Sequence, residues 1–216
     1  MSRLIPTYDE CYAFVLLSKF GIKDCILSDK PDIISNDRTW GIEIVSALFE
    51  GEHKLETYFI KQKEKDTSKD KDKDNDKKEY PLPDGYESFG YGVIGPCLCE
   101  HKLSPDDLTI EDSIKIAIDM IKKKKEKSIN YHVEKISLYI TSELCFRDEE
   151  RLKGIASRMY NEAKDVFQYL YINVRDSNNL IICSKCDIFV HHYNQHEIAI
   201  EAYKLYDSYQ KHTHED

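Results

Sequence analysis

Apolar residues recur along the chain with two different periods, which predict an alternation of helices and strands. Spacings of three and four residues predict helices at about 7–20, 104–127, 148–164 and 194–209. Short runs rich in β-branched and aromatic residues predict strands within 32–45 and at 136–141, 167–174 and 180–183. Strands interleaved with helices predict an α/β fold, with a mixed central sheet flanked by helices.

Residues 31–45 predict a β-hairpin with one carboxylate on each strand. Polar turn formers at 35–37 separate two apolar stretches, and Asp32 and Glu43 lie within those stretches. Burying an ionised carboxylate is costly unless it is paired or binds a metal. Two carboxylates that a hairpin brings together would also repel, and a divalent cation would offset that repulsion. The hairpin is therefore a candidate metal site.

This hairpin resembles the core motif of the PD-(D/E)XK nuclease superfamily through Pro31-Asp32, a turn, and Gly41-Ile42-Glu43-Ile44-Val45. In that superfamily the Asp and the Glu hold Mg²⁺, and a Lys two residues after the Glu helps to position the attacking water. The resemblance implies a restriction-endonuclease-like fold. It also implies that Asp32, Glu43 and the Ile44 carbonyl bind Mg²⁺ or Mn²⁺.

The chain departs from the motif at the lysine, because Val45 stands in its place. Residues 43 and 45 share one face of a strand, so an apolar side chain replaces the expected cation. Some members of the superfamily supply a Lys or Gln from a neighbouring helix. The candidates for that substitute are Lys54, Lys61 and Gln62 of a helix predicted from Ser46 to about Gln62, and the run Lys122, Lys123, Lys124 and Lys125. Each of them has the alternative of being an ordinary surface residue.

Glu10 has two interpretations. Thr7 followed by Glu10 three residues later forms a capping box at the start of the first helix. Related nucleases sometimes place an additional metal-binding acid on this helix, so the resemblance also makes Glu10 a supplementary metal ligand.

The run Lys122–Lys125 is the one basic patch that is positioned to contact phosphates. Cations also suit a helix C-terminus, which accounts for part of the cluster without any ligand. Nucleic acid is the partner that the resemblance implies, with DNA ahead of RNA, and a homodimer is an expectation from the same source.

Residues 63–79 alternate Lys and Asp with almost no apolar side chain. Such a segment cannot bury a core, so we predict a disordered charged insertion within a single domain spanning 1–216. Gly and Pro recur throughout residues 80–103, which predicts a loop.

Four cysteines form two short motifs, Cys97-Leu98-Cys99 and Cys183-Ser184-Lys185-Cys186. Four thiolates could hold a structural Zn²⁺. The first pair is tightly spaced, however, and Cys183 ends an apolar strand where a free Cys simply packs. We therefore expect no zinc.

Net charge and cysteine content restrict the class of protein. A formal charge of −9 argues against a general nucleic-acid coat protein but allows a nuclease with a local basic surface. No apolar run approaches the roughly 20 residues of a membrane span. Seven cysteines without a signal sequence favour the reducing cytoplasm.

Two functions lead from the sequence, ahead of a weaker third, which is an interaction module that the four cysteines stabilise through zinc. The first is a metal-dependent endonuclease. The second is a catalytically inactive relative that binds or regulates a partner, for example in a phage or bacterial defence system. They differ in whether a Lys or Gln side chain reaches the Asp32–Glu43 pair in the folded chain.

Overall fold

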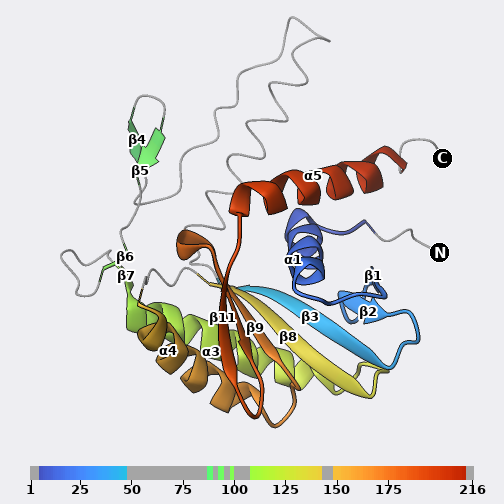
Figure 1. Ribbon diagram of the computed structural model, residues 1–216, viewed down its shortest axis with the longest axis horizontal. Coiled ribbons are helices and arrows are strands. Elements are labelled where there is room, and N and C mark those ends of the chain that lie inside the picture. The colour runs from blue at the N-terminus through green and yellow to red at the C-terminus, as the bar shows by residue number, and fades with distance from the viewer. Residues whose placement is uncertain are drawn as a thin grey trace, which may run out of the picture. The chain divides into compact units, whose positions relative to one another are not determined.

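The computed structural model describes residues 5–47, 108–142 and 148–212, together with short strands between residues 87 and 99 (Figure 1). The chain divides into two compact units, residues 1–47 with 114–216 and residues 48–113. The first unit holds the large sheet and the candidate site.

A seven-stranded mixed sheet forms the centre of the first unit, in the order β1-β2-β3-β8-β9-β10-β11. Its strands are β1 Cys25–Leu27, β2 Ile33–Ser35, β3 Trp40–Ala47, β8 Lys135–Ser142, β9 Leu170–Val174, β10 Asn179–Cys183 and β11 Ile188–His192. The β3–β8 and β8–β9 pairs are parallel and the other neighbours are antiparallel. The predicted α/β class with a mixed, helix-flanked sheet is confirmed.

Helices cover both faces of this sheet. The described helices are α1 Tyr8–Lys19, α3 Ile110–Ser128, α4 Glu149–Ala163 and α5 Gln195–His212, and a 3₁₀ turn occupies Arg175–Ser177. Helices α1 and α5 pack on one face, while α3 and α4 lie along the other (Figure 1). None of the described helices is long and apolar enough to span a bilayer.

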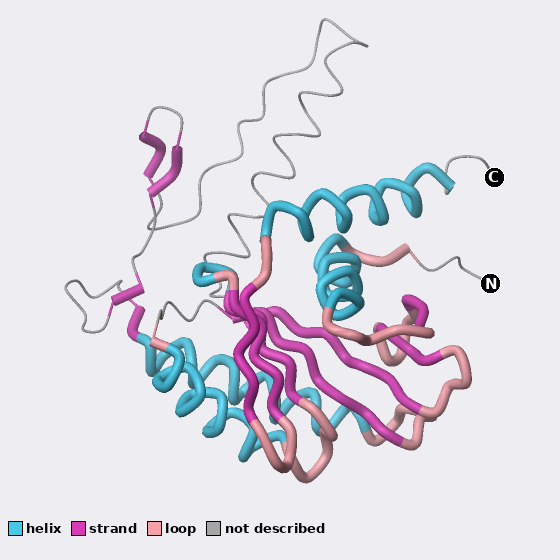
Figure 2. The backbone as a smooth tube through the Cα atoms, in the orientation of Figure 1, coloured by secondary structure: helices cyan, strands magenta, loops and turns pink. Residues whose placement is uncertain are grey.

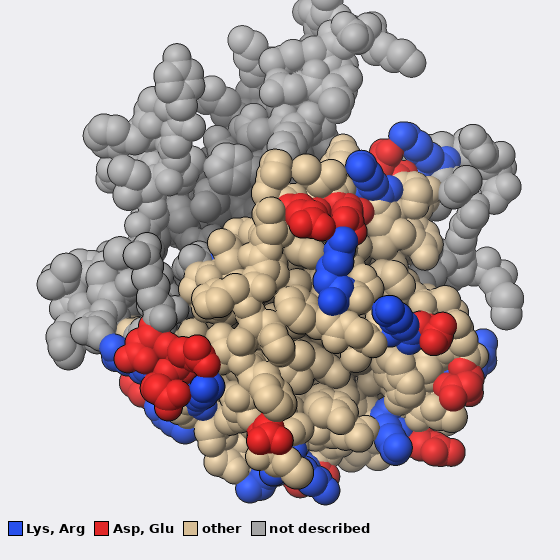
Figure 3. Space-filling view, viewed as in Figure 1, with Lys and Arg blue, Asp and Glu red and all other residues tan. Residues whose placement is uncertain are grey.

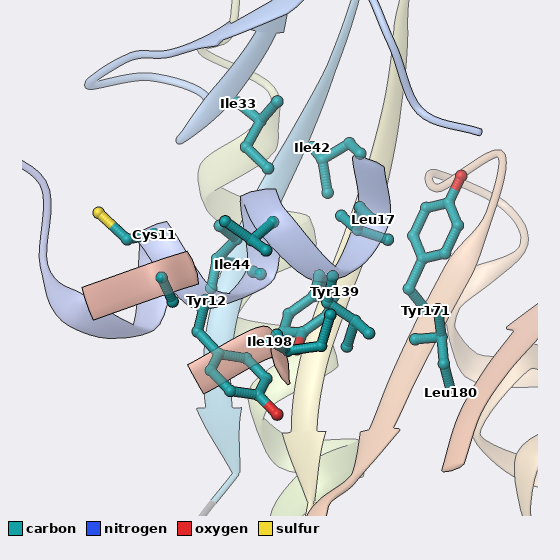
Figure 4. Packing of buried hydrophobic residues seen from close by; sticks show 14 of the residues in the cluster. Cys11, Tyr12, Leu17, Ile33, Ile42, Ile44, Tyr139, Tyr171, Leu180 and Ile198 are labelled. Carbon is teal, nitrogen blue, oxygen red and sulfur yellow. The ribbon is translucent and has the colours of Figure 1, made fainter. Parts of the chain in front are cut away.

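The main hydrophobic cluster lies between the sheet and α1. Figure 4 shows side chains from β2, β3, β8 and β9 converging on this helix, among them Ile33, Ile42, Ile44, Tyr139 and Tyr171. All five are at most 8 % exposed. Burying each aliphatic side chain of this size stabilises the fold by about 1.5–3 kcal/mol, so the hairpin is held firmly on this face.

Two helices begin with reciprocal caps. The backbone N–H of Glu10 donates to the Thr7 hydroxyl at 3.2 Å, and the Thr7 N–H donates to the Glu10 carboxylate at 2.7 Å. This confirms the capping role predicted for Glu10. Thr109 and Asp112 form the same arrangement at α3, which fixes its first residue at Ile110.

Two boundaries and one additional strand differ from the sequence prediction. Helix α3 does not begin at 104, because Leu108–Thr109 forms strand β7. Strand β3 continues to Ala47, where a helix from Ser46 was expected, since Ser46 and Ala47 pair with β8. Strand β11 was missed, because its half-buried pattern shows no strict alternation.

Short strands occur within the stretch predicted to be a loop. Strand β4 Glu87–Phe89 pairs with β5 Gly92–Ile94, and β6 Leu98–Cys99 pairs with β7. The rest of the helix predicted to Gln62 and the predicted insertion at 63–79 lie outside the described residues.

Candidate functional site

The hairpin register places the two predicted carboxylates on one face of the sheet. Ile33 pairs with Ile42, so the antiparallel register continues to Asp32 and Glu43 as cross-strand neighbours. Successive side chains of a strand alternate between faces. Because Ile33 and Ile42 pack against α1, Asp32 and Glu43 point to the opposite face, on the side of α3.

Asp32 is a carboxyl group that titrates near neutral pH. Burial raises the pKa of Asp32 to about 7, and the charges of Glu43 and Glu10 act in the same direction. The Ile44 N–H, which donates to Asp32 Oδ2 at 2.6 Å, and Lys124 oppose this rise. Asp32 can therefore gain or lose a proton around pH 7, as a ligand or an acid–base group requires.

Glu43 is a buried carboxylate that is paired on one oxygen only. It is 4 % exposed, and its Oε1 accepts a hydrogen bond from Lys124 Nζ on α3. Its Oε2 is also buried and has no hydrogen-bond partner within the described ranges. An oxygen in this state is costly to bury unpaired, so it is a position at which a positively charged ligand would stabilise the fold.

The phase of α3 explains why Lys124 reaches the hairpin. Ile114, Ala117 and Ile121 form the buried stripe of this helix, each at most 1 % exposed. Lys124 follows Ile121 by three residues and therefore lies on the same stripe, facing the sheet. The helix thus places a cation on the sheet face where Val45, which is half buried, provides none.

The four-lysine run does not act as one patch. Lys124 pairs with Glu43, and Lys125 donates to Asp165 Oδ1 at 2.7 Å and to the Glu162 carbonyl at 2.9 Å. Only Lys122 and Lys123 are exposed. Phosphate contact by the run stays a prediction, and helical spacing turns Lys124 and Lys125 towards partners within the chain.

Charged side chains on the face viewed in Figure 3 likewise occur in small groups of mixed sign, and the described part of that face shows no continuous basic area. Lys54, Lys61 and Gln62 lie outside the described residues.

Tyr131 is a site residue that the sequence analysis missed. It lies in the loop after α3, and burial, followed by a hydrogen bond to Glu43 and the charges of Glu43, Asp32 and Asp29, raises its pKa. The phenol therefore keeps its proton and donates it to the Glu43 carboxylate. No local sequence pattern indicated this residue, because its approach to Glu43 depends on the tertiary packing of α3 on the sheet.

The cysteines of the second motif are free. Cys183 is buried, which raises its pKa to about 12, whereas Cys186 is exposed. A protonated, buried thiol is a poor zinc ligand. The side chains of Cys97 and Cys99 lie outside the described residues.

The donor set at the hairpin fits a hard divalent cation. Asp32 and Glu43 offer carboxylate oxygens, one of which has no partner among the described groups. Mg²⁺ is commonly held by one or two carboxylates together with water and substrate phosphate. Within the described ranges, no group of three or more His, Cys, Asp or Glu side chains is arranged around a metal position. A cation here would therefore depend on water or substrate to complete its shell.

No protein-family model, curated protein or solved structure matched this chain. The resemblance of the hairpin to PD-(D/E)XK nucleases therefore stays a prediction.

Proposed function

We propose that this chain is a metal-dependent nuclease that hydrolyses phosphodiester bonds in nucleic acid. The observation that supports it best is the contact between Lys124 and Glu43. The superfamily motif has a lysine beside its carboxylates, and this chain has Val45 at that position. Helix α3 supplies that lysine from a distant part of the chain.

Each side chain has a role in this proposal. Asp32 and Glu43 would hold Mg²⁺ or Mn²⁺, which when bound lowers the pKa of water and stabilises charge on the phosphate. Asp32 binds a cation in its ionised form, which its pKa of about 7 makes available at and above neutral pH. Lys124 would orient the attacking water and offset developing negative charge, and the hydrogen bond from the Tyr131 hydroxyl would hold the Glu43 carboxylate in place.

The second candidate function is a catalytically inactive binding or regulatory protein. The valine at position 45 and the net charge of −9 favour it, since both weaken a phosphodiesterase site. The presence of a lysine in the pocket favours the nuclease, because an inactive relative has no need of a buried ion pair that contributes little to stability by itself.

Metal binding and cleavage together test the proposal. Calorimetric titration of Mn²⁺ should show saturable binding to the wild type and none to Glu43→Gln. Labelled single-stranded and duplex DNA and RNA should be cleaved in Mn²⁺ by the wild type and not by Asp32→Asn. Asp119→Asn, which changes an exposed acid of α3, is the matched control and should cleave normally.

Cleavage retained by Asp32→Asn would refute the assignment. Saturable Mn²⁺ binding without cleavage of any of the four substrates would favour the binding protein instead.

A further inference from the structure

A second concavity, of about 500 Å³, opens at the end of the sheet where β8 and β9 begin. The loops that precede these two strands and the turn between β10 and β11 line it, at the lower edge of the sheet in Figure 2. Its volume lies within the range of about 300–1,000 Å³ that is usual for ligand sites. Tyr131 lines this concavity and also lies beside Glu43, so the two sites adjoin.

The lining carries an excess of positive charge in a chain that is acidic as a whole. Lys135, Lys164 and Lys185 line the concavity, against Glu134 and Asp165. The Asp165 carboxylate is already paired with Lys125, which does not itself line the concavity. Lys135 and Lys185 are exposed, and the Lys164 ammonium donates to Asn161 Oδ1 at 2.8 Å, so an anionic group is the ligand that complements this lining.

Aromatic and apolar side chains form the remainder of the wall. Tyr131 and Tyr169 are half buried, Phe167 is 1 % exposed, and the Tyr169 ring is held at 6.0 Å from the Tyr171 ring. Rings that are fixed in place but still accessible provide faces for stacking with a nucleobase, which strengthens binding by about 5- to 150-fold per base. Lysines beside such rings match a nucleotide, which joins a flat base to a phosphate.

We propose that this concavity binds one unpaired nucleotide of the substrate strand, with the base against Tyr169 and the phosphate on Lys164 and Lys185. The inference rests on the proposed nuclease function and names its substrate class as single-stranded or locally unpaired nucleic acid. A base within a duplex is stacked and paired on both sides, so it cannot enter without leaving the helix.

Binding without metal tests the site apart from catalysis. Fluorescein-labelled octathymidylate is titrated in EDTA and followed by anisotropy. Lys185→Glu should weaken binding at least tenfold and Tyr169→Ala at least fivefold, while Tyr169→Phe, which keeps the ring, should restore the affinity. Lys204→Glu makes the same charge change on exposed helix α5 and should alter affinity less than twofold. Unlabelled thymidine monophosphate should displace labelled octathymidylate better than inorganic phosphate does. A blunt duplex should displace it at least tenfold less well than an unlabelled single strand does.

Several outcomes would overturn the inference. These are the absence of octathymidylate binding to the wild type, equal effects of Lys185→Glu and Lys204→Glu, equal competition by duplex, and equal competition by inorganic phosphate. Cleavage separates this inference from the proposed function. If the wild type cuts DNA in Mn²⁺ while Lys185→Glu and Tyr169→Ala bind and cut normally, the nucleotide site is refuted and the nuclease stands. If binding depends on Lys185 and Tyr169 but no substrate is cut, the nucleotide site stands and the nuclease is refuted.

Discussion

The two faces of the β2–β3 hairpin are built from alternate residues of the same two strands. On one face Ile33, Ile42 and Ile44 join the apolar cluster beneath α1 (Figure 4). On the other face Asp32 and Glu43 adjoin and meet α3 through one ion pair. The apolar face fixes the register, because a slip of one residue would exchange the two sets of side chains.

The two faces of the hairpin contribute differently, one to the stability of the fold and the other to its chemistry. Burial of apolar side chains stabilises the first face, whereas the second keeps a buried carboxylate that is only half satisfied. A well-packed apolar substitute would often be as stable as a buried ion pair, so stability alone does not explain the second face. The comparison predicts that substitutions on the polar face change activity and that those on the apolar face change stability.

Replacement of Lys124 by Met should have the largest effect on activity. The substitution keeps most of the side-chain volume and removes the cation beside Glu43. We expect Mn²⁺-dependent cleavage to fall about 10³-fold, as when one preorganised charge or donor is removed from an active site. Lys124→Arg, which retains the charge, should recover part of the loss in steady-state kinetics.

Lys125→Met is the matched control on the same helix. Lys125 pairs with Asp165, whose side chain is 64 % exposed, and surface pairs of this kind contribute at most about 1 kcal/mol. Its cleavage rate should therefore stay near that of the wild type. An equal loss of cleavage rate in Lys124→Met and Lys125→Met would mean that the lysines act through their general positive charge and not through the Lys124–Glu43 contact.

Removal of apolar volume from the other face should act on stability. Ile42 is 1 % exposed within the cluster, so Ile42→Ala should reduce the free energy of unfolding by about 2–5 kcal/mol in denaturant titrations. Activity per folded molecule should persist at temperatures where the variant remains folded. Ile26→Ala removes an isoleucine that is 53 % exposed and should change stability far less.

The fold was predictable where local signals and burial agree. The helices that became α1 and α4 and the strands that became β9 and β10 follow from local apolar patterns, and all four form close to their predicted bounds. Strand β11 was not predictable in this way, because this edge strand is only partly buried and its sequence carries a weak pattern. Strand β3 extends beyond its predicted end because of its pairing with β8, which is a tertiary interaction.

The candidate site was predictable in its carboxylates and not in their partner. Asp32 and Glu43 are close in sequence and share one hairpin, so local pattern was sufficient. The pairing of Glu43 with Lys124 spans 81 positions and requires the packing of α3 on the sheet. The apolar stripe through Ile121 favours Lys124 and Lys125 over Lys122 and Lys123, and that phase information was available from the sequence.

Gly41 tests how closely the polar face is packed. A Cβ at this position would collide with the Pro31 ring and lie 3.0 Å from the Ile33 carbonyl oxygen. Gly41→Ala should therefore destabilise the chain by about 1–3 kcal/mol, by separating β2 from β3. Activity should fall as well, because Asp32 follows Pro31 directly. Thermal unfolding and cleavage assays measure both effects.

Gly154→Ala provides the control for that substitution. Gly154 lies within α4 with no atom within 4 Å of the added Cβ. Alanine should stabilise this helix by about 0.5–1 kcal/mol and leave cleavage unchanged. Destabilisation of similar size in both variants would contradict a specific close approach at Gly41.

The stability of the chain should also depend on pH through Asp32. Its pKa is about 7 in the folded chain, against about 3.9 in an unfolded one. Below pH 4 both states hold the proton, and between pH 4 and 7 only the folded state keeps it. Stability from this group is therefore lost as the pH rises through that window and is constant above pH 7. Asp32→Asn should remove this slope from unfolding curves.

Metal affinity should change with pH in the opposite direction. Because a cation binds the ionised carboxylate, Mn²⁺ affinity should rise about tenfold between pH 6 and pH 8. Calorimetry in two buffers of different ionisation enthalpy should show nearly one proton released per Mn²⁺ at pH 6 and almost none at pH 8. Affinity that is constant over this range would mean that Asp32 is already ionised at pH 6. The carboxylates of the polar face would then titrate like those of an ordinary exposed surface. The two faces of the hairpin would differ in polarity but not in any special proton or metal chemistry.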